Sequence, residues 1–325
     1  MSISEGLGER FVNSAAEQRA LKLAANRYCD AMGWPTIFLL AVVAPSYFAL
    51  PILAALGWVS HWFVVPAMAF LTYAAYTPMH EAAHGSVCGA GRRFRWVNDA
   101  VGYVAGLTLA IPYTAHRFEH FTHHAHTNDA ERDPDLICAD MTQSVWQAVV
   151  SSSAMLTNQY RFFMAQCWAT ATIKVRLNFV VEASAIVLSR VLLLFVLLGP
   201  VAEATSLAGW QLAASMIMTL LVGPVLGMVL LVYLFAYIVH VPHTERGAFV
   251  DTSVFVWPKA LRTLGTWLWG FQNYHGVHHV VPRVPWYRYR AFYEDHEQQL
   301  LASGLPSYTL RTMLWTQTPL KENAV

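Results

Sequence analysis

The sequence predicts an all-α integral membrane protein in which four transmembrane helices carry a cytoplasmic helical cap with a histidine-rich di-metal site. Of its 325 residues, 56% are hydrophobic and 13% are charged, whereas soluble domains have about 25% charged residues. Four apolar stretches are long enough to cross a bilayer as helices, which takes roughly 20 residues each. Twelve of the 14 histidines gather in the polar regions between and after these stretches. The whole chain, 1–325, is expected to form one domain.

The first segment, 1–33, is polar and mixed in charge. Apolar residues at helical spacing, such as Leu7, Phe11 and Leu21, have arginines and a lysine between them, and this pattern predicts an amphipathic helix. The helix lies on the membrane surface or forms a solvated leader. It lacks the apolar core of a signal peptide, so no cleavage is expected.

The apolar stretches predict spans at about 34–57, 60–80, 178–202 and 210–240. The first two are separated by a very short break, which indicates a hairpin, and a short polar turn joins the last two. A further apolar stretch, 100–115, is short and interrupted by glycines and a proline. We therefore expect it to be re-entrant or interfacial.

The third span contains two charged residues, Glu182 and Arg190. A charge at the centre of a bilayer costs about 2.5–3.5 kcal/mol on insertion scales. Arg190 is therefore expected to sit near the interface, to pair with Glu182 or to line a cavity.

Arginine and lysine decide the predicted orientation. The turns between spans one and two and between spans three and four contain neither residue, whereas the N-terminus, the 80–176 loop and the region after 244 contain nearly all of them. The excess of positive residues on the cytoplasmic side of membrane proteins puts both termini and the histidines in the cytoplasm, in a multi-pass protein of the inner or cytoplasmic membrane.

The histidines form three boxes and one pair at spacings that suit metal binding. His80 and His84 are four residues apart, so on a helix they share one face. Two HxxHH clusters and a pair at the end of the fourth span follow: His120, His123 and His124; His275, His278 and His279; His240 and His243. So many imidazoles suit a two-metal site, although imidazole alone does not choose between iron, zinc, copper and nickel.

Other site classes fit less well. The HEAAH sequence at His80 satisfies the zinc peptidase pattern HExxH, but one zinc needs only three protein ligands. The four cysteines contain no CxxC pair, which argues against a disulfide framework or a thiolate metal site. The net charge of +1 and the lack of a basic, aromatic-interleaved patch exclude nucleic acid as a partner.

HEAAH, HFTHH and HGVHH resemble the three histidine boxes of the membrane fatty acid desaturase superfamily. The flanking HTNDAERDPD and NYHGVHHVVPRVPWYRY are similar to its bacterial acyl and carotenoid members, and the likeness covers roughly 34–290. The resemblance implies two irons held by the eight histidines of the boxes. It also implies a ligand from the end of the fourth span, for which His243 is favoured over His240. The ligand set is therefore His80, His84, His120, His123, His124, His240 or His243, His275, His278 and His279.

The resemblance further implies an O2-dependent oxidation of unactivated C–H bonds in a lipid. A fatty acyl desaturase is the leading interpretation, acting on a chain linked to CoA, acyl carrier protein or a glycerolipid. A carotenoid hydroxylase or ketolase, or an acyl hydroxylase, is the alternative, and a membrane zinc peptidase is a distant one. Electrons are expected from a separate ferredoxin- or cytochrome-type donor with its reductase.

Residues beside the boxes are expected to support the ligands. His116 and His126 lie outside the HxxHH pattern, so contacts behind the ligands are favoured over ligation. Asp133 and Asp135 either orient ligand imidazoles through their second N–H or make loop hydrogen bonds. Glu81 is expected to support a neighbouring histidine rather than to act as a base.

Overall fold

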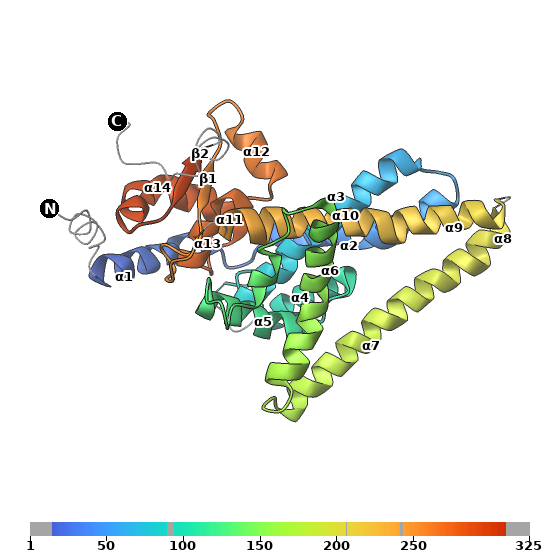
Figure 1. The fold of residues 1–325 in the computed structure, drawn as a ribbon, viewed down its shortest axis with the longest axis horizontal. Helices are drawn as coiled ribbons and strands as arrows, with labels where there is room; N and C mark the ends of the chain where they lie inside the picture. Colours follow the sequence, from blue (N-terminus) through green and yellow to red (C-terminus); the bar gives the residue numbers. More distant parts are fainter. Residues whose placement is uncertain (1–14, 90–93, 206, 241–242, 310–325) are drawn as a thin grey trace.

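The computed structural model describes residues 15–89, 94–205, 207–240 and 243–309, and these are mostly helical. The predicted all-α class holds, with one small addition. Strands β1 (Val254–Val256) and β2 (Ser307–Thr309) pair in parallel, with Val254 opposite Ser307. In Figure 1 helices α1 (Ala15–Ala24) and α14 (Tyr289–Ala302) lie at the same end of the molecule as this strand pair.

Three helical stretches in the described residues are long and apolar enough to cross a membrane: Trp34–Ala55, Ile173–Ala204 and Gly209–His240. They correspond to three of the four predicted spans. The remaining predicted span, 60–80, corresponds to helix α3 (His61–His84), which is not one of these three stretches. Helix α3 packs against α2 (Trp34–Ala55), α4 (Arg95–Leu109) and α10 (Gly223–Leu231). Four spans therefore remain a prediction.

Glycines let α10 approach α3 closely. A Cβ atom on Gly223 would lie 2.6 Å from the Cβ of Met68, and one on Gly227 would lie 2.5 Å from the carbonyl oxygen of Ala69. The two glycines are four residues apart and so share one face of α10. Small residues at this spacing are typical of close helix pairs in membranes. The contact brings the end of the last apolar stretch to the end of α3, where His80 and His84 lie.

The last apolar stretch is not a regular α-helix throughout. It runs through α9 (Gly209–Ile217), α10 and α11 (Ile238–His240), with π-helical turns at Met218–Val222 and Val232–Tyr237. Such wider turns occur often at functional sites. The second one directly precedes His240.

Helices α4 and α5 (Tyr113–His126) form a hairpin across the predicted re-entrant stretch 100–115. Two charged residues of α7 (Ile173–Val196) bind the helix ends on either side of the turn between them. Arg190 donates to the carbonyl oxygens of Leu107 and Thr108 at 2.6 and 2.7 Å. Glu182 accepts from the backbone N–H of Thr114 at 2.9 Å. Arg190 thus binds orphan carbonyls at the end of α4, and Glu182 binds an orphan N–H at the start of α5.

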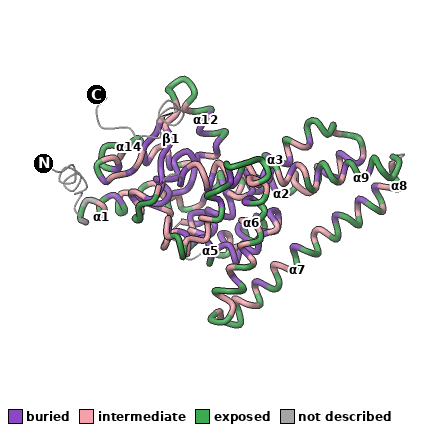
Figure 2. Tube along the Cα trace, in the orientation of Figure 1, coloured by how far each residue is buried: buried purple, intermediate pink, exposed green. Residues whose placement is uncertain are grey.

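The remaining helices complete the cap beside the histidines. They are α1 (Ala15–Ala24), α6 (Val145–Phe162), α12 (Arg262–Leu268), α13 (His275–Val280) and α14 (Tyr289–Ala302), and α8 (Ala202–Ala204) follows α7. Figure 2 shows buried residues concentrated in the cap and between α2, α3 and α10, whereas α7 and α9 are largely exposed or intermediate. Exposed apolar side chains on α7, such as Leu188 at 58% and Phe195 at 68%, are what a lipid-facing helix presents.

The predicted N-terminal amphipathic helix is helical over Ala15–Ala24, and its residues before 15 lie outside the described part of the chain. Leu21 and Ala25 are buried against the C-terminal cap, in one cluster with Val277 and Phe292. Protein therefore covers part of the apolar face of this helix. Its position at the membrane surface stays a prediction.

Candidate metal centre

The first histidine box ends a helix. His80 and His84 lie in the last turns of α3, and Gly85 follows in the left-handed conformation with φ of 72°. Glycine adopts this conformation without a steric penalty, and this is why the helix stops there. His80 is fully buried and His84 is half-buried.

The second and third boxes lie on α5 and α13. His120, His123 and His124 occupy the last two turns of α5. His275, His278 and His279 occupy the short helix α13, which follows a 3-10 turn at Gln272–Tyr274.

The structure brings five histidines from all three boxes together. Their ligand nitrogens lie within 4.8 Å of one another. The Nε2 atom of His120 is 2.7 Å from that of His84 and 3.1 Å from that of His124, and the Nε2 atoms of His124 and His278 are 2.9 Å apart. We call this set the five-histidine group: His80, His84, His120, His124 and His278.

These distances fit one metal ion. Two imidazole nitrogens that each lie about 2.0–2.1 Å from a metal are separated by about 2.8–3.4 Å at coordination angles between about 90° and the tetrahedral angle. The separations of 2.9 and 3.1 Å lie in this range, and that of 2.7 Å lies just below it. His80 adds a second sign, because it is 0% exposed and neither of its ring nitrogens has a hydrogen-bond partner. Buried polar groups are normally paired, so a ligand for this imidazole is implied.

A second set, which we call the three-histidine group, comprises His123, His240 and His279. All three side chains are buried, and their ligand nitrogens also lie within 4.8 Å of one another. His275 lies beside them, with its ring centre 5.1 Å from that of His240 and 4.8 Å from that of His279. The chain therefore offers two neighbouring metal positions.

Polar groups hold the outer nitrogens of several of these rings. The Nδ1 atom of His123 lies 2.8 Å from Asp133, and that of His279 lies 3.4 Å from Asp251. A carboxylate that accepts the Nδ1–H proton fixes the tautomer and leaves Nε2 free to bind a metal. His275 is held in the same way by Gln272, at 3.2 Å.

In the five-histidine group a tyrosine takes this role. The Nδ1 atom of His278 lies 2.9 Å from the hydroxyl oxygen of Tyr289, and that hydroxyl donates to Glu81 at 3.0 Å. Glu81 also accepts from the Ser86 hydroxyl and from the backbone N–H of Trp286. Tyr289 thus links Glu81 of the first box to His278 of the third box.

A comparison with known proteins identifies the family. The model of the family described as fatty acid desaturase matches residues 56–311. The chain belongs to the fatty acid desaturase family. The two histidine groups give this family member side chains that can hold metal ions. The three apolar helices agree with a membrane location for this family member.

Three curated relatives illustrate the range of the family. The chain is 32% identical over 81 residues to a bifunctional fatty acid conjugase/Delta(12)-oleate desaturase of Punica granatum, which covers 25% of this chain and 19% of the relative. It is 30% identical over 114 residues to an sn-1 oleoyl-lipid 12-desaturase of Synechocystis, covering 34% and 30%. It is 25% identical over 239 residues to a zeaxanthin 4-ketolase of Chlamydomonas reinhardtii, covering 72% and 44%. The chain thus aligns with less than half the length of each of these relatives.

The structure places the two histidines at the end of the fourth predicted span, His240 and His243, in different surroundings. His243 was favoured from the sequence as the additional ligand, with His240 as the alternative. His240 lies in the three-histidine group, whereas the ring of His243 lies 6.1 Å from that of Tyr308 and in neither group. His240 is the last residue of α11 and is buried, whereas His243 is half-buried.

The other supporting residues also have defined positions. The His116 ring stacks on His120 with ring centres 5.1 Å apart, and its Nδ1 atom lies 3.3 Å from Gln159. His126 is only partly buried and lies in neither histidine group. Asp133 contacts His123 as described, and Asp135 lies 3.5 Å from the same nitrogen.

Sequence reasoning missed Asp251, Gln272 and Tyr289. Tyr289 belongs to the WYRY sequence after the third box, so its closeness to the box was a usable signal. Gln272 lies three residues before His275, which was a similar signal. Asp251 had none, because it is an isolated acidic residue in a loop that only the fold brings to His279.

Burial sets the protonation of the ligands. It lowers the pKa of His120, His124 and His278 well below the ordinary value of 6.5, so these rings are neutral near pH 7. Neutral imidazole is the form that binds metals. Burial acts on His123 in the same direction, but Asp135 and Asp133 outweigh it and raise the pKa of His123 to about 9.

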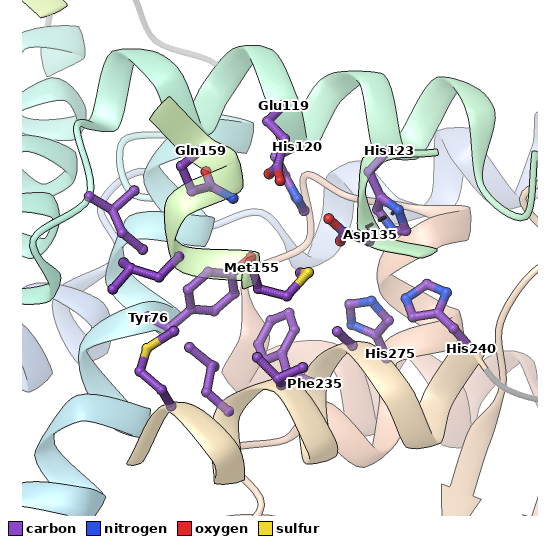
Figure 3. A pocket seen from close by; sticks show the side chains of 16 residues that line it. Tyr76, Glu119, His120, His123, Asp135, Met155, Gln159, Phe235, His240 and His275 are labelled. Atoms are coloured by element: carbon purple, nitrogen blue, oxygen red, sulfur yellow. Dashed lines mark ion pairs between the residues drawn. The ribbon is translucent and has the colours of Figure 1, made fainter. Parts of the chain in front are cut away.

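A narrow cavity of about 40 Å³ opens beside the centre. Figure 3 shows His120, His123, His240 and His275 around one side of it. Tyr76, Met155, Leu156, Met228, Leu231 and Phe235 make the apolar wall. An apolar group placed there would lie directly beside the histidines.

Proposed function

We propose that this protein is an O2-dependent di-iron enzyme that oxidises unactivated C–H bonds of a lipid, most directly a fatty acyl desaturase. The observation that carries the proposal is the convergence of histidines from three boxes into two neighbouring groups. Family membership, for which di-iron centres are known, supports iron as the metal.

The five-histidine group would hold one iron and the three-histidine group, with His275 beside it, the other. Irons bound there would activate O2 for removal of hydrogen from a C–H bond. The residues of the chain do the positioning. Asp133, Asp251 and Tyr289 keep Nε2 of their histidines pointed inward, and the apolar wall of the cavity excludes water and receives the hydrocarbon.

The small volume of the cavity, about 40 Å³, favours a linear acyl chain over a bulkier cyclic end group. A carotenoid ketolase or hydroxylase is the second candidate, because the zeaxanthin 4-ketolase aligns over 72% of this chain, more than twice the share covered by the oleoyl-lipid 12-desaturase. The bonds from Tyr289, Ser86 and Trp286 to Glu81 argue against a zinc peptidase, since they occupy the carboxylate that would act as its base.

Electrons would come from a ferredoxin- or cytochrome-type donor with its reductase. We also propose four spans, with both termini and the histidines in the cytoplasm, on the distribution of arginine and lysine. Analysis of the lipid products identifies the position of the new bond.

The test is lipid and pigment profiling of cells with and without the gene, combined with metal analysis of purified protein. We expect new double bonds in acyl chains and about two iron ions per chain. Altered carotenoids with unchanged acyl unsaturation would favour the second candidate. One metal per chain, or zinc without iron in protein prepared under reducing conditions with iron supplied, would contradict the di-iron proposal.

A further inference from the structure

Two hollows in the described part of the chain share one side chain. The cavity beside the histidines and an outer cleft of about 350 Å³ are both lined by Ile111. Ile111 is 3% exposed and lies in the turn between α4 and α5. The Ile111 side chain therefore borders both the outer cleft and the space next to the candidate metal centre.

The outer cleft lies between α4 and α7 and is mainly apolar. Val104 and Leu107 line it from α4, and Val181 and Ile186 line it from α7. Helix α7 belongs to the apolar stretch Ile173–Ala204, which is long enough to cross a membrane. In the bilayer, a cleft bordered by this helix is reached by lipid chains and not only by water.

The turn that carries Ile111 is held on several sides. The backbone N–H of Ile111 donates to Gly106 at 2.9 Å, and the hydroxyl of Tyr160 donates to the carbonyl of Ala110 at 2.7 Å. Arg190 and Glu182 of α7 bind the two helix ends on either side of the turn. With the backbone fixed in this way, the size of the Ile111 side chain decides whether the two hollows connect.

We propose that the hydrocarbon chain of the lipid substrate enters from the bilayer through the cleft between α4 and α7, and that Ile111 is the gate to the metal centre and limits the width of the chain that passes. This inference rests on the proposed function, since it needs a lipid substrate. It adds a route and a specificity-determining residue. Ile111 acts on the substrate and binds no metal.

The first experiment compares Ile111→Trp and Ile111→Ala with the full-length wild type in cells. We expect Ile111→Trp to lower product formation at least tenfold while iron content per chain stays unchanged. Ile111→Ala should increase the conversion of methyl-branched chains relative to straight ones. The matched control is Val187→Trp, because Val187 is 63% exposed on α7 and lines neither hollow.

The second experiment uses the wild-type protein, so it does not depend on how a variant folds. A fatty acid carrying a diazirine in its chain is placed in phosphatidylcholine vesicles with the protein and photolysed. Crosslinks within 103–111 and 178–186 are expected, and excess unlabelled fatty acid should abolish them.

Crosslinks confined to the other large apolar hollow, around Trp257 and Trp269, would overturn the route. So would an Ile111→Trp variant with normal iron and wild-type product. A wild type that oxidises no lipid at all would instead contradict the proposed function. The two failures are therefore distinguishable.

Discussion

The two histidine groups lie side by side but differ in what surrounds them. In the five-histidine group, His84 and His124 are only half-buried. The Nδ1 atom of His278 contacts the neutral hydroxyl of Tyr289 at 2.9 Å, and that of His80 lies 3.8 Å from Glu81. In the three-histidine group every ring is buried, and carboxylates stand behind His123 and His279. An imidazole whose Nδ1–H is bound by a carboxylate binds a metal more strongly than one whose Nδ1–H is bound by a neutral group.

This difference indicates that the two metal positions are not equivalent. The five-histidine group relies on the number of its ligands. The three-histidine group has fewer and relies on the negative charge of Asp133, Asp135 and Asp251. Substitution of a residue that contacts the Nδ1 atom of one histidine should therefore affect one metal position more than the other.

The largest effects are expected from removal of one ligand in each group. His278→Ala and His240→Ala should each lower activity at least about 100-fold, because even partners behind a ligand account for about 10- to 100-fold. Iron analysis should show close to one iron lost per chain in each variant. Retention of two irons and activity in either variant would remove that residue from its group.

The next effect in size is expected from Asp133→Asn, which keeps the shape of the side chain but removes its charge. Iron affinity of the three-histidine group should fall about 10- to 100-fold. Chelator titration of the purified protein measures it, and one iron of the two should become easier to remove. Asp140→Asn is the control, since Asp140 is exposed and contacts Gln143. Equal weakening of both irons would contradict the separation of the groups.

A smaller effect is expected from Tyr289→Phe, which removes the hydroxyl that contacts His278 and donates to Glu81. The iron affinity of the five-histidine group should fall by roughly tenfold, the lower end of the range for residues that contact a ligand. The same chelator titration measures it. Tyr287→Phe serves as the matched control, because the Tyr287 hydroxyl contacts Asp30 and no histidine. A larger loss than in Asp133→Asn would reverse the proposed order of the two groups.

The smallest effect is expected from His243→Ala. His243 lies beside Tyr308 and in neither group, so iron content and product formation should stay near wild type. Metal analysis alongside His240→Ala makes the comparison direct. Loss of an iron in His243→Ala with retention in His240→Ala would return the ligand role to His243.

Much of this site follows from local sequence. The boxes are read from residue types and short spacings, and a helix places residues four apart on one face whatever surrounds it. The apolar stretches follow from composition in the same way, and three of the four predicted spans match stretches that can cross a membrane. The partners of Arg190 could not be predicted, because they are backbone carbonyls of a hairpin some 80 residues earlier in the chain.

The sequence by itself determined the family, the helical class and the identity of the histidine boxes, because these depend on residue types at fixed spacing. The tertiary structure alone divided the boxes between two positions. Successive helical residues point about 100° apart, so the adjacent His123 and His124 face different groups, as do His278 and His279. Which direction meets which partner depends on how α3, α5, α11 and α13 pack. That packing also places His240 beside His123 and His279 and brings Asp251 and Tyr289 behind the rings.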